Sequence, residues 1–202
     1  MIFVLAGVNG AGKSSIGGAA IRQAGQTWYD PDAEARALQR QFPTLPPDEI
    51  NGRVWHEGLR RLRQAIQDDR DFAFETTLGG RTITDTLLDG MAAGVRVSIW
   101  YCGLASVEQH IARVAARVAR GGHAIPEDLI RARYRRSMNN LCRLTPGVHR
   151  LAVYDNSAEL DAQGRPQIRR LLHVRDGRLT EMTQAMPAWA KPVAAVCLTH
   201  FT

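Results

Sequence analysis

The stretch "GVNGAGKS", Gly7 to Ser14, decides the fold of this 202-residue chain. It matches the pattern G-x-x-x-x-G-K-S/T in full, and it directly follows the apolar run "IFVLA" of residues 2–6. Its glycines let the backbone curl closely around a phosphate, because glycine adopts positive φ without a steric penalty. The stretch therefore predicts a phosphate-binding loop, or P-loop, between a central strand and a helix over about residues 13–24.

The positions of this loop have predicted tasks toward a nucleoside triphosphate. Backbone N–H groups would point at the β-phosphate, helped by the N-terminus of the following helix. Lys13 would bridge the β- and γ-phosphates, and the Ser14 hydroxyl would be a magnesium ligand. The positions predicted to bind the nucleotide are Asn9, Gly10, Ala11, Gly12, Lys13, Ser14 and Ser15. We therefore expect ATP and Mg²⁺ as cofactors.

Strand and helix patterns alternate along the rest of the chain. Apolar runs predict strands at residues 2–6, 27–30, 72–75, 95–103 and 150–157. Helices are expected from residue 31, over 45–66 and 82–93, and from residues 107 and 126. Asp176-Gly177 between alternating apolar residues predicts a hairpin. We expect an α/β fold: an open parallel sheet flanked by helices, forming one kinase-like domain over 1–202, with the hairpin and tail at about 158–202.

Composition restricts the classes of ligand. The chain has a net charge of +6, and nearly all of its positive charge is arginine, since Lys13 and Lys191 are its only lysines. Arginine suits bidentate contacts with phosphate, which favours a site for anions, although solvated arginine faces give the same composition. Only 6% of residues are aromatic, and no platform for stacking bases is visible, which argues against nucleic acid as a partner.

Cysteine usage and hydropathy predict the surroundings of the protein. Its three cysteines are odd in number, far apart and without metal-ligand spacing, which argues against a disulfide framework or structural zinc: Cys102, Cys142 and Cys197. A reducing cytoplasm fits this usage best. No apolar run approaches the ~20 residues of a membrane span, and the N-terminus lacks a basic leader, so we expect neither membrane insertion nor a signal peptide.

Several classes of P-loop protein are unsupported. The chain has no N-K-x-D motif for guanine, no LSGGQ-like signature and no apolar strand that ends in Asp-Glu. It is also too short for a hexameric motor with a helical lid domain. A small phosphotransferase remains favoured, and such an enzyme needs a base for the acceptor hydroxyl, a substrate cradle and arginines over the phosphates.

Two aspartates follow the predicted second strand. Asp30 precedes Pro31, so we interpret Asp30 as the N-cap of a helix whose first residue is proline. Asp32 lies at the edge where ligands bind in open α/β sheets, and we favour it as the general base. The alternative is that both carboxylates only cap the helix.

Polar residues also end the predicted third strand, "FAFETTLGG". Glu75 could hold magnesium through water or bind hydroxyl groups of the acceptor, and Thr76 and Thr77 place hydroxyls at the same edge. The remaining alternative is a polar strand end without a ligand, since threonine is also favoured in strands. The sequence leaves these readings open, and we favour acceptor binding because Asp32 offers a separate base.

Arginines gather on two consecutive predicted helices joined by "GGHAIPE". The first set shares one helix face and the second follows the glycine break: Arg113, Arg117 and Arg120, then Arg131, Arg133, Arg135 and Arg136. We expect a lid at about 106–141 that brings two or three guanidinium groups to the transferring phosphoryl group. The alternative is a solvated arginine face.

The ordered set of the P-loop, "DPD", "FETTLGGR", "RVAARVARGGHAIPEDLIRARYRRS" and "YDNS" resembles the zeta-toxin family of bacterial kinases, and most of all its branch often labelled predicted ABC-type ATPase. The resemblance covers roughly residues 1–156. It implies an ATP-dependent kinase of a nucleotide-sugar, UDP-N-acetylglucosamine, acting on the 3′-hydroxyl. It also implies a toxin restrained by an antitoxin, which we expect to be a separate protein.

The resemblance assigns roles by position. Lys13 and Ser14 match the triphosphate and magnesium residues, and Asp32 matches the general base. The remaining matches are the acceptor cradle at Glu75 and Thr76, the lid arginines Arg117 and Arg133, and Asn156 near the adenine. We also expect Thr77 and Arg81, from the same stretch, to bind the acceptor. Three alternatives stay open: a kinase of another nucleotide such as a dinucleotide cofactor, a kinase of nucleic-acid ends, and a non-enzymatic ATP-dependent switch.

Overall fold

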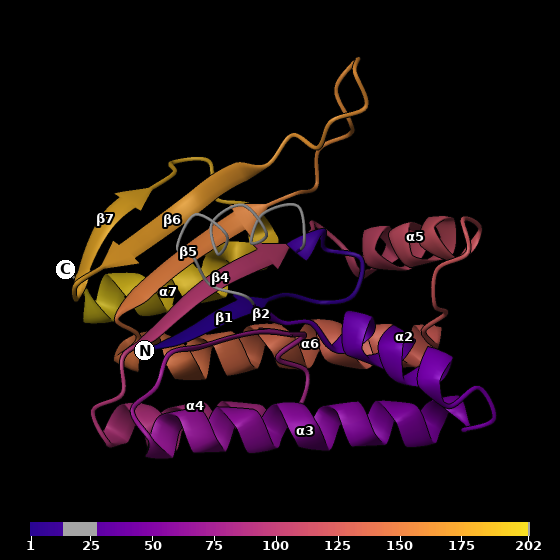
Figure 1. Ribbon diagram of the computed structural model, residues 1–202. Coiled ribbons are helices and arrows are strands. Elements are labelled where there is room, and N and C mark those ends of the chain that lie inside the picture. The colour runs from indigo at the N-terminus through magenta and orange to yellow at the C-terminus, as the bar shows by residue number, and fades with distance from the viewer. Residues whose placement is uncertain (14–27, 202) are drawn as a thin grey trace.

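Seven strands form one sheet in the computed structural model of the protein, which describes residues 1–13 and 28–201. The strands are β1 Ile2–Ala6, β2 Trp28–Tyr29, β3 Phe72–Thr76, β4 Val97–Gly103, β5 Arg150–Asp155, β6 Arg169–Arg175 and β7 Arg178–Met182. The first five are parallel, as predicted, and the last two are antiparallel (Figure 1). The predicted helix at 13–24, with Ser14 and Ser15, lies outside the described residues.

The strand order β2-β3-β1-β4-β5-β6-β7 places β1 at the point where the chain changes direction across the sheet. After β1 the chain first builds strands on one side of it and then, from β4, on the other. Ala6 at the end of β1 pairs with Thr76 of β3 and with Tyr101 of β4. Ligands of open α/β sheets bind at the carboxyl ends of strands at such a switch point. The P-loop that follows Ala6 occupies this place.

The predicted hairpin is confirmed at β6 and β7, which extend the sheet as antiparallel strands. Its turn has positive φ at both central residues, 52° at Asp176 and 72° at Gly177. This backbone matches the right-handed twist of the flanking strands. The hairpin therefore extends the sheet, and its turn lies at the edge opposite the P-loop.

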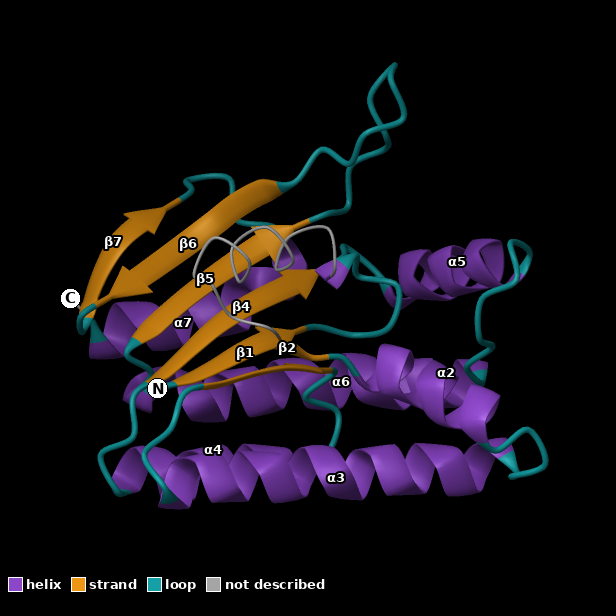
Figure 2. Ribbon diagram, viewed as in Figure 1, coloured by secondary structure: helices purple, strands orange, loops and turns teal. Residues whose placement is uncertain are grey.

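Most helices in the described part of the chain cover one face of the sheet, and α5 (Val107–Val118) lies beyond the carboxyl ends of the strands (Figures 1 and 2). The helices are α2 Pro31–Gln41, α3 Pro47–Gln67, α4 Arg81–Ala92, α5 Val107–Val118, α6 Glu127–Leu144 and α7 Lys191–His200, with 3-10 turns η1 Thr145–Gly147 and η2 Ala188–Ala190. The predicted cap is present, since Asp30 accepts from the N–H groups of Asp32 and Ala33, and Ser106 caps α5 by accepting from the N–H of Gln109. These caps fix where α2 and α5 begin, beside the P-loop.

The main hydrophobic core lies between this face of the sheet and the helices. Alternate strand residues such as Val4, Ile99 and Leu151 point into it and are essentially buried, as strand periodicity requires. The other parity, Leu5 and Ala73, belongs to a separate small cluster on the opposite face. None of the helices in the described ranges is long and apolar enough to cross a membrane.

The tail beyond the hairpin, which the sequence left unassigned, returns to the core. Helix α7 buries Val193, Ala194 and Cys197 in the main cluster and packs on α6. Trp189 lies so close to Gly103 that a Cβ there would be 2.4 Å from the indole ring. The tail therefore covers the end of β4 and holds α6 in place.

Candidate active site

The P-loop is held against the ends of β4, α5 and β5 through its glycines. Gly7, Gly10 and Gly12 have φ of 140°, 82° and 84°. A Cβ on them would lie 2.2 Å from the Cys102 carbonyl oxygen, 2.8 Å from the His110 carbonyl oxygen and 2.4 Å from Nδ2 of Asn156, respectively. Both the backbone conformation and the space at these positions require glycine. These three glycines thus allow the loop to pack closely against β4, α5 and the residue that follows β5.

Lys13 and Glu75 form a buried ion pair at the centre of the site. Nζ of Lys13 lies 3.4 Å from Oε1 of Glu75, and the two side chains are only 8% and 13% exposed. Burial raises the pKa of the Glu75 carboxyl, Lys13 opposes this rise, and the charges of Asp30 and Asp32 add to it. Oε2 of Glu75 is buried without a hydrogen-bond partner in the described part of the chain. This second carboxyl oxygen is therefore an unused acceptor beside the one that pairs with Lys13.

Asp32 and Arg117 meet at the mouth of the site. Oδ2 of Asp32, on α2, lies 3.6 Å from Nη1 of Arg117 on α5, and both side chains are well exposed to solvent. Arg117 also donates to the carbonyl oxygen of His123 in the turn between α5 and α6. An exposed pair at this distance contributes little stability, so either group is free to exchange partners. The predicted base and a predicted lid arginine thus lie side by side.

Arg133 reaches the P-loop from α6. Its Nη1 donates to Oδ1 of Asn9 at 2.8 Å, and its stem lies over Gly79. Burial lowers the pKa of Arg133, and the nearby charge of Asp32 opposes this. The structure therefore brings Arg133 beside the P-loop, as the lid prediction requires of one arginine.

Asn156 lies behind the P-loop. Its Nδ2 donates to the carbonyl oxygen of Ala11 at 2.9 Å, and the Sγ–H of Cys102 donates to the same oxygen at 2.9 Å. Arg113 in turn donates to the carbonyl oxygen of Asn156. The described contacts of Asn156 brace the loop, while its predicted place near the adenine stays a prediction. The sequence did not point to Cys102, and it placed Arg113 among the candidate lid arginines rather than behind the loop.

Two hydroxyl groups of the predicted acceptor cradle form hydrogen bonds within the turn that follows β3. Oγ1 of Thr76 accepts from the N–H of Leu78, and Oγ1 of Thr77 accepts from that of Gly79. Arg81 is exposed at the first position of α4. The same turn is fixed from α6, where Ser137 and Asn140 donate to carbonyl oxygens of residues 77, 78 and 80. The segment after Glu75 is thus rigidly placed, and its role toward an acceptor stays a prediction.

His110 is a buried residue of the site that the sequence did not reveal. It is 1% exposed, and its Nδ1 hydrogen-bonds to the carbonyl oxygen of Asn9 at 2.8 Å. Burial lowers its pKa from 6.5 to about 4, with smaller effects of Lys13 and Arg113 in the same direction. The imidazole is therefore neutral at pH 7, and the carbonyl partner requires its proton on Nδ1.

This burial predicts an acid sensitivity of folding. Between pH 6.5 and 4 the unfolded chain binds a proton at His110 that the folded chain does not, so stability falls as pH falls. His110→Asn keeps a donor near the Nδ1 position but does not titrate. By pH 4 the wild type should lose about 3 kcal/mol more unfolding free energy than this variant, measured by urea denaturation from pH 7 to 4. Equal losses would contradict the buried, neutral imidazole.

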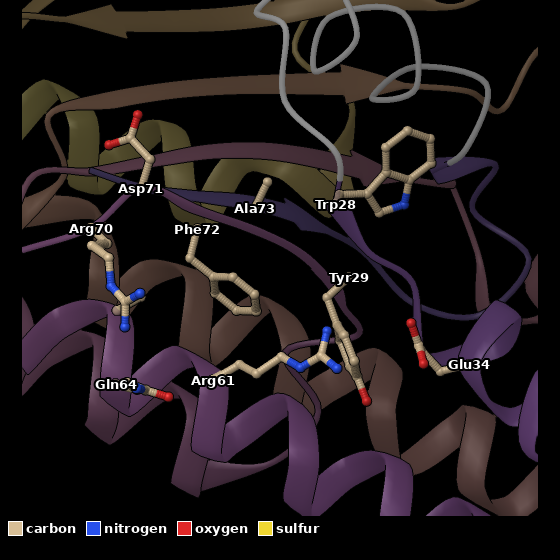
Figure 3. A pocket seen from close by; sticks show the side chains of 10 residues that line it. Trp28, Tyr29, Glu34, Arg61, Gln64, Arg70, Asp71, Phe72 and Ala73 are labelled. Atoms are coloured by element: carbon tan, nitrogen blue, oxygen red, sulfur yellow. The ribbon is translucent and has the colours of Figure 1, made fainter. Parts of the chain in front are cut away.

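A cavity of about 520 Å³ lies elsewhere, beside the sheet edge formed by β2 and β3 (Figure 3). The guanidinium of Arg61 lies over the ring of Tyr29, 5.1 Å from its centroid. Three of the four charged residues that line this cavity already have ion-pair partners: Arg61 pairs with Glu57, Arg70 with Asp68, and Asp71 with the N-terminal ammonium. We therefore place the chemistry at the P-loop, whose buried acceptor and arginines suit a phosphorylated ligand better.

The residues present fit a magnesium ion bound with a triphosphate. The vacant Oε2 of Glu75 is a hard oxygen ligand of the kind that Mg²⁺ takes directly or through water. Among residues 1–13 and 28–201, no group of three or more His, Cys, Asp or Glu side chains could hold a metal by itself. The predicted ligand Ser14 lies outside the described residues. A metal here would depend on the phosphates for much of its coordination.

No protein-family model matches this chain. One curated protein, an uncharacterized protein from Haemophilus influenzae, is 34% identical over 128 residues, which covers 63% of this chain and 88% of that protein. This identity over most of the relative's length establishes common descent. It does not indicate an activity, because the relative is itself uncharacterized.

Solved structures with the same fold include two from protein assemblies. The crystal structure of AvrRxo1-ORF1:-ORF2 with ATP matches with a TM-score of 0.60 at 14% identity, over 100% of this chain and 76% of that chain. The PezAT chromosomal toxin–antitoxin system of Streptococcus pneumoniae matches with a TM-score of 0.56 at 12% identity, over 100% and 76%. These likenesses confirm the predicted fold class, an open α/β sheet of the P-loop kinase-like kind.

Proposed function

We propose, for a chain that belongs to the family of the Haemophilus influenzae protein, that the site transfers the γ-phosphate of ATP to a hydroxyl group of a small molecule. The favoured acceptor is a nucleotide-sugar, UDP-N-acetylglucosamine, because the ordered motifs resemble zeta-toxin kinases. The likeness in fold to a structure that contains ATP supports the choice of ATP as the phosphate donor.

The observation that carries this proposal is the buried Lys13–Glu75 pair inside a P-loop. A lysine 8% exposed, beside a carboxyl whose second oxygen has no described partner, forms a charged and dry site at the switch point of the sheet. Such a site suits a ligand that brings negative charge to the lysine and polar groups to the carboxyl. In phosphoryl transfer to a hydroxyl, the triphosphate provides the negative charge and the acceptor provides the polar group.

The proposed reaction divides among named residues. The acceptor oxygen forms a bond to the γ-phosphorus while the bond from that phosphorus to the β,γ-bridging oxygen breaks, and ADP leaves. Asp32 takes the hydroxyl proton, since its carboxylate is exposed and, among the described residues, has only the weak pair with Arg117. Lys13 and Arg133 stabilise charge on the phosphoryl oxygens. Glu75 and the backbone around Thr76 orient the acceptor.

Magnesium would be held by Ser14 and the triphosphate, with Glu75 near enough to act through water. When bound it would neutralise charge shared by the β- and γ-phosphates. We further propose that α5 and the first half of α6 act as the lid, since they carry Arg117 to the proposed base Asp32 and Arg133 to the P-loop. The whole chain would then be one kinase domain.

A separate antitoxin is the proposed protein partner. AvrRxo1-ORF1 is crystallised with ORF2, and PezAT is a toxin–antitoxin system, so this fold occurs in such complexes. All three cysteines are free thiols, which supports a reducing cytoplasmic location where ATP and nucleotide-sugars are available. The partner would act by keeping nucleotide or acceptor away from the P-loop.

The test is an untargeted search for phosphorylated metabolites in cells that express the wild type or Asp32→Asn. We expect the wild type to accumulate a phosphorylated nucleotide-sugar and Asp32→Asn to lose about 10²-fold or more of this activity, with ATP affinity retained. Glu34→Gln is the matched control, because Glu34 is the other acid in the first turn of α2. It should behave like the wild type.

Two outcomes would contradict the proposal. If no metabolite gains a phosphate in cells whose growth is inhibited by the protein, the site does not act as a metabolite kinase. If Asp32→Asn keeps the full biological effect, the protein acts as an ATP-dependent switch without transfer. Labelled nucleic-acid ends in place of a metabolite would instead establish the nucleic-acid alternative.

A further inference from the structure

Arg133 is a cationic side chain that pairs with no carboxylate among the described residues. It is half-buried, and burial lowers its pKa. Across the described part of the chain it has no carboxylate within ion-pair distance, and its one hydrogen bond goes to the neutral amide oxygen of Asn9. A guanidinium has five N–H donors, so most of them are available to a ligand. Arg131, two residues earlier on α6, differs by pairing with Glu108 and Glu127.

Contacts at both ends of the Arg133 side chain fix its position. At the head, Oδ1 of Asn9 accepts from Nη1 at 2.8 Å. At the stem, Gly79 leaves the room, because a Cβ there would lie 2.7 Å from Cγ of Arg133. Asn9 itself is fixed by the 2.8 Å hydrogen bond from His110 to its carbonyl oxygen. Three elements, the P-loop, α5 and α6, therefore meet at one asparagine.

We propose that Asn9 is a positioning residue whose amide oxygen holds the Arg133 guanidinium at the P-loop, ready to contact the γ-phosphate, while His110 fixes Asn9 from behind. The inference rests on the proposed function for the identity of the ligand. A neutral acceptor suits this task, since it orients the guanidinium without cancelling its charge. A carboxylate in the same place would compete with the phosphate.

This arrangement predicts that Asn9 contributes to discrimination between ATP and ADP. The γ-phosphate is the group that Arg133 would contact, so losing Arg133 should weaken ATP binding far more than ADP binding. Losing the Asn9 side chain should have the same selective effect, because Asn9 acts through Arg133. A residue that only shaped the P-loop would weaken both nucleotides alike, since both bind the loop through their β-phosphate.

The test is a double-mutant cycle on the full chain with Asn9→Ala, Arg133→Ala and the double variant. Calorimetry would measure the Kd for Mg-ATP and for ADP in each. Arg133→Ala should lower the preference for ATP over ADP at least about tenfold, the usual effect of a hydrogen bond to a charged group. Asn9→Ala should cause most of that loss, and the double variant no more than Arg133→Ala alone.

Two further variants keep the result interpretable. Arg131→Ala, on the same helix, should leave both Kd values unchanged. Asn9→Asp keeps an acceptor for Arg133 and should hold the fold at least as well, yet lower the preference for ATP because the aspartate charge competes for the guanidinium. Thermal unfolding of each variant would show that the protein is folded when its affinities are measured.

The proposal is overturned if Asn9→Ala keeps the wild-type ratio of ATP to ADP affinity, if both affinities fall together, or if the losses of the two single variants multiply in the double variant. This outcome is separable from a failure of the proposed function. Absence of phosphoryl transfer by the wild type would reject the kinase, while the binding cycle would still decide whether Asn9 positions Arg133 toward a third phosphate.

Discussion

Gly7→Ala is expected to abolish ATP binding and to destabilise the fold by roughly 2–5 kcal/mol. Gly7 has a φ of 140°, where side chains are strained, and its new Cβ would lie 2.2 Å from the Cys102 carbonyl oxygen. That oxygen belongs to β4, a central strand of the sheet. Because neither backbone can yield without breaking sheet pairing, the loop itself must move. Calorimetry with ATP and urea denaturation would measure the two effects.

Gly52→Ala is the matched control for this prediction. Gly52 lies inside α3, and nothing is within 4 Å of the place where its Cβ would stand. Alanine should therefore stabilise the protein by up to about 1 kcal/mol through its higher helix propensity, with ATP affinity unchanged. A Gly7→Ala protein that binds ATP normally and unfolds like the wild type would show that the P-loop is not packed on β4 as described.

Lys13→Ala is expected to remove phosphoryl transfer by at least about 10³-fold, together with much of the ATP affinity. The lysine charge is the one placed inside the P-loop, and its burial makes its electrostatic effect strong. The fold should survive, because Glu75 can take up a proton once its partner is gone. Its pKa is already raised by burial and would rise further without Lys13.

Lys191→Ala supplies the control for this variant. Lys191 is the other lysine of the chain, and it is exposed at the start of α7. Its removal should change neither ATP affinity nor transfer. A steady-state assay with ATP titration separates the loss of binding from the loss of turnover. Transfer by Lys13→Ala at the wild-type rate would contradict a phosphate-bearing role for this lysine.

The sequence predicted the frame of the fold well because its signals are local. The P-loop pattern after an apolar strand, Pro31 after a capping aspartate, and Asp176-Gly177 in a hairpin are each dictated by backbone stereochemistry within a few residues. The strand order, with β1 between β3 and β4, depends on contacts distant in sequence, and periodicity contains no information about it. Helix α7 escaped notice because its apolar residues do not form one clear stripe.

The predicted site residues met a similar limit. Lys13, Asp32 and Glu75 were predicted because each lies in a motif or near the end of an element, and Arg133 because its helix is rich in arginine; their roles stay predictions. Three residues that support the P-loop were not predicted to do so: Cys102, His110 and Arg113. Each donates to a backbone carbonyl oxygen, and the residue type at a position does not reveal such a partner. The sequence offered one indication that His110 is buried, namely its position on a mostly apolar face of a predicted helix. Only the fold shows that this face meets the P-loop.

The most direct test of the kinase proposal is phosphate transfer by the purified full chain. It would be incubated with Mg²⁺ and ATP labelled in the γ-phosphate, and with UDP-N-acetylglucosamine, other nucleotide-sugars, nicotinamide dinucleotides or oligonucleotide ends in parallel. We expect label to move to UDP-N-acetylglucosamine, giving a product heavier by one phosphate group and an equal amount of ADP, with Asp32→Asn inactive. Label that reaches none of these acceptors, while ATP binds tightly, would contradict the assignment of this site to phosphoryl transfer.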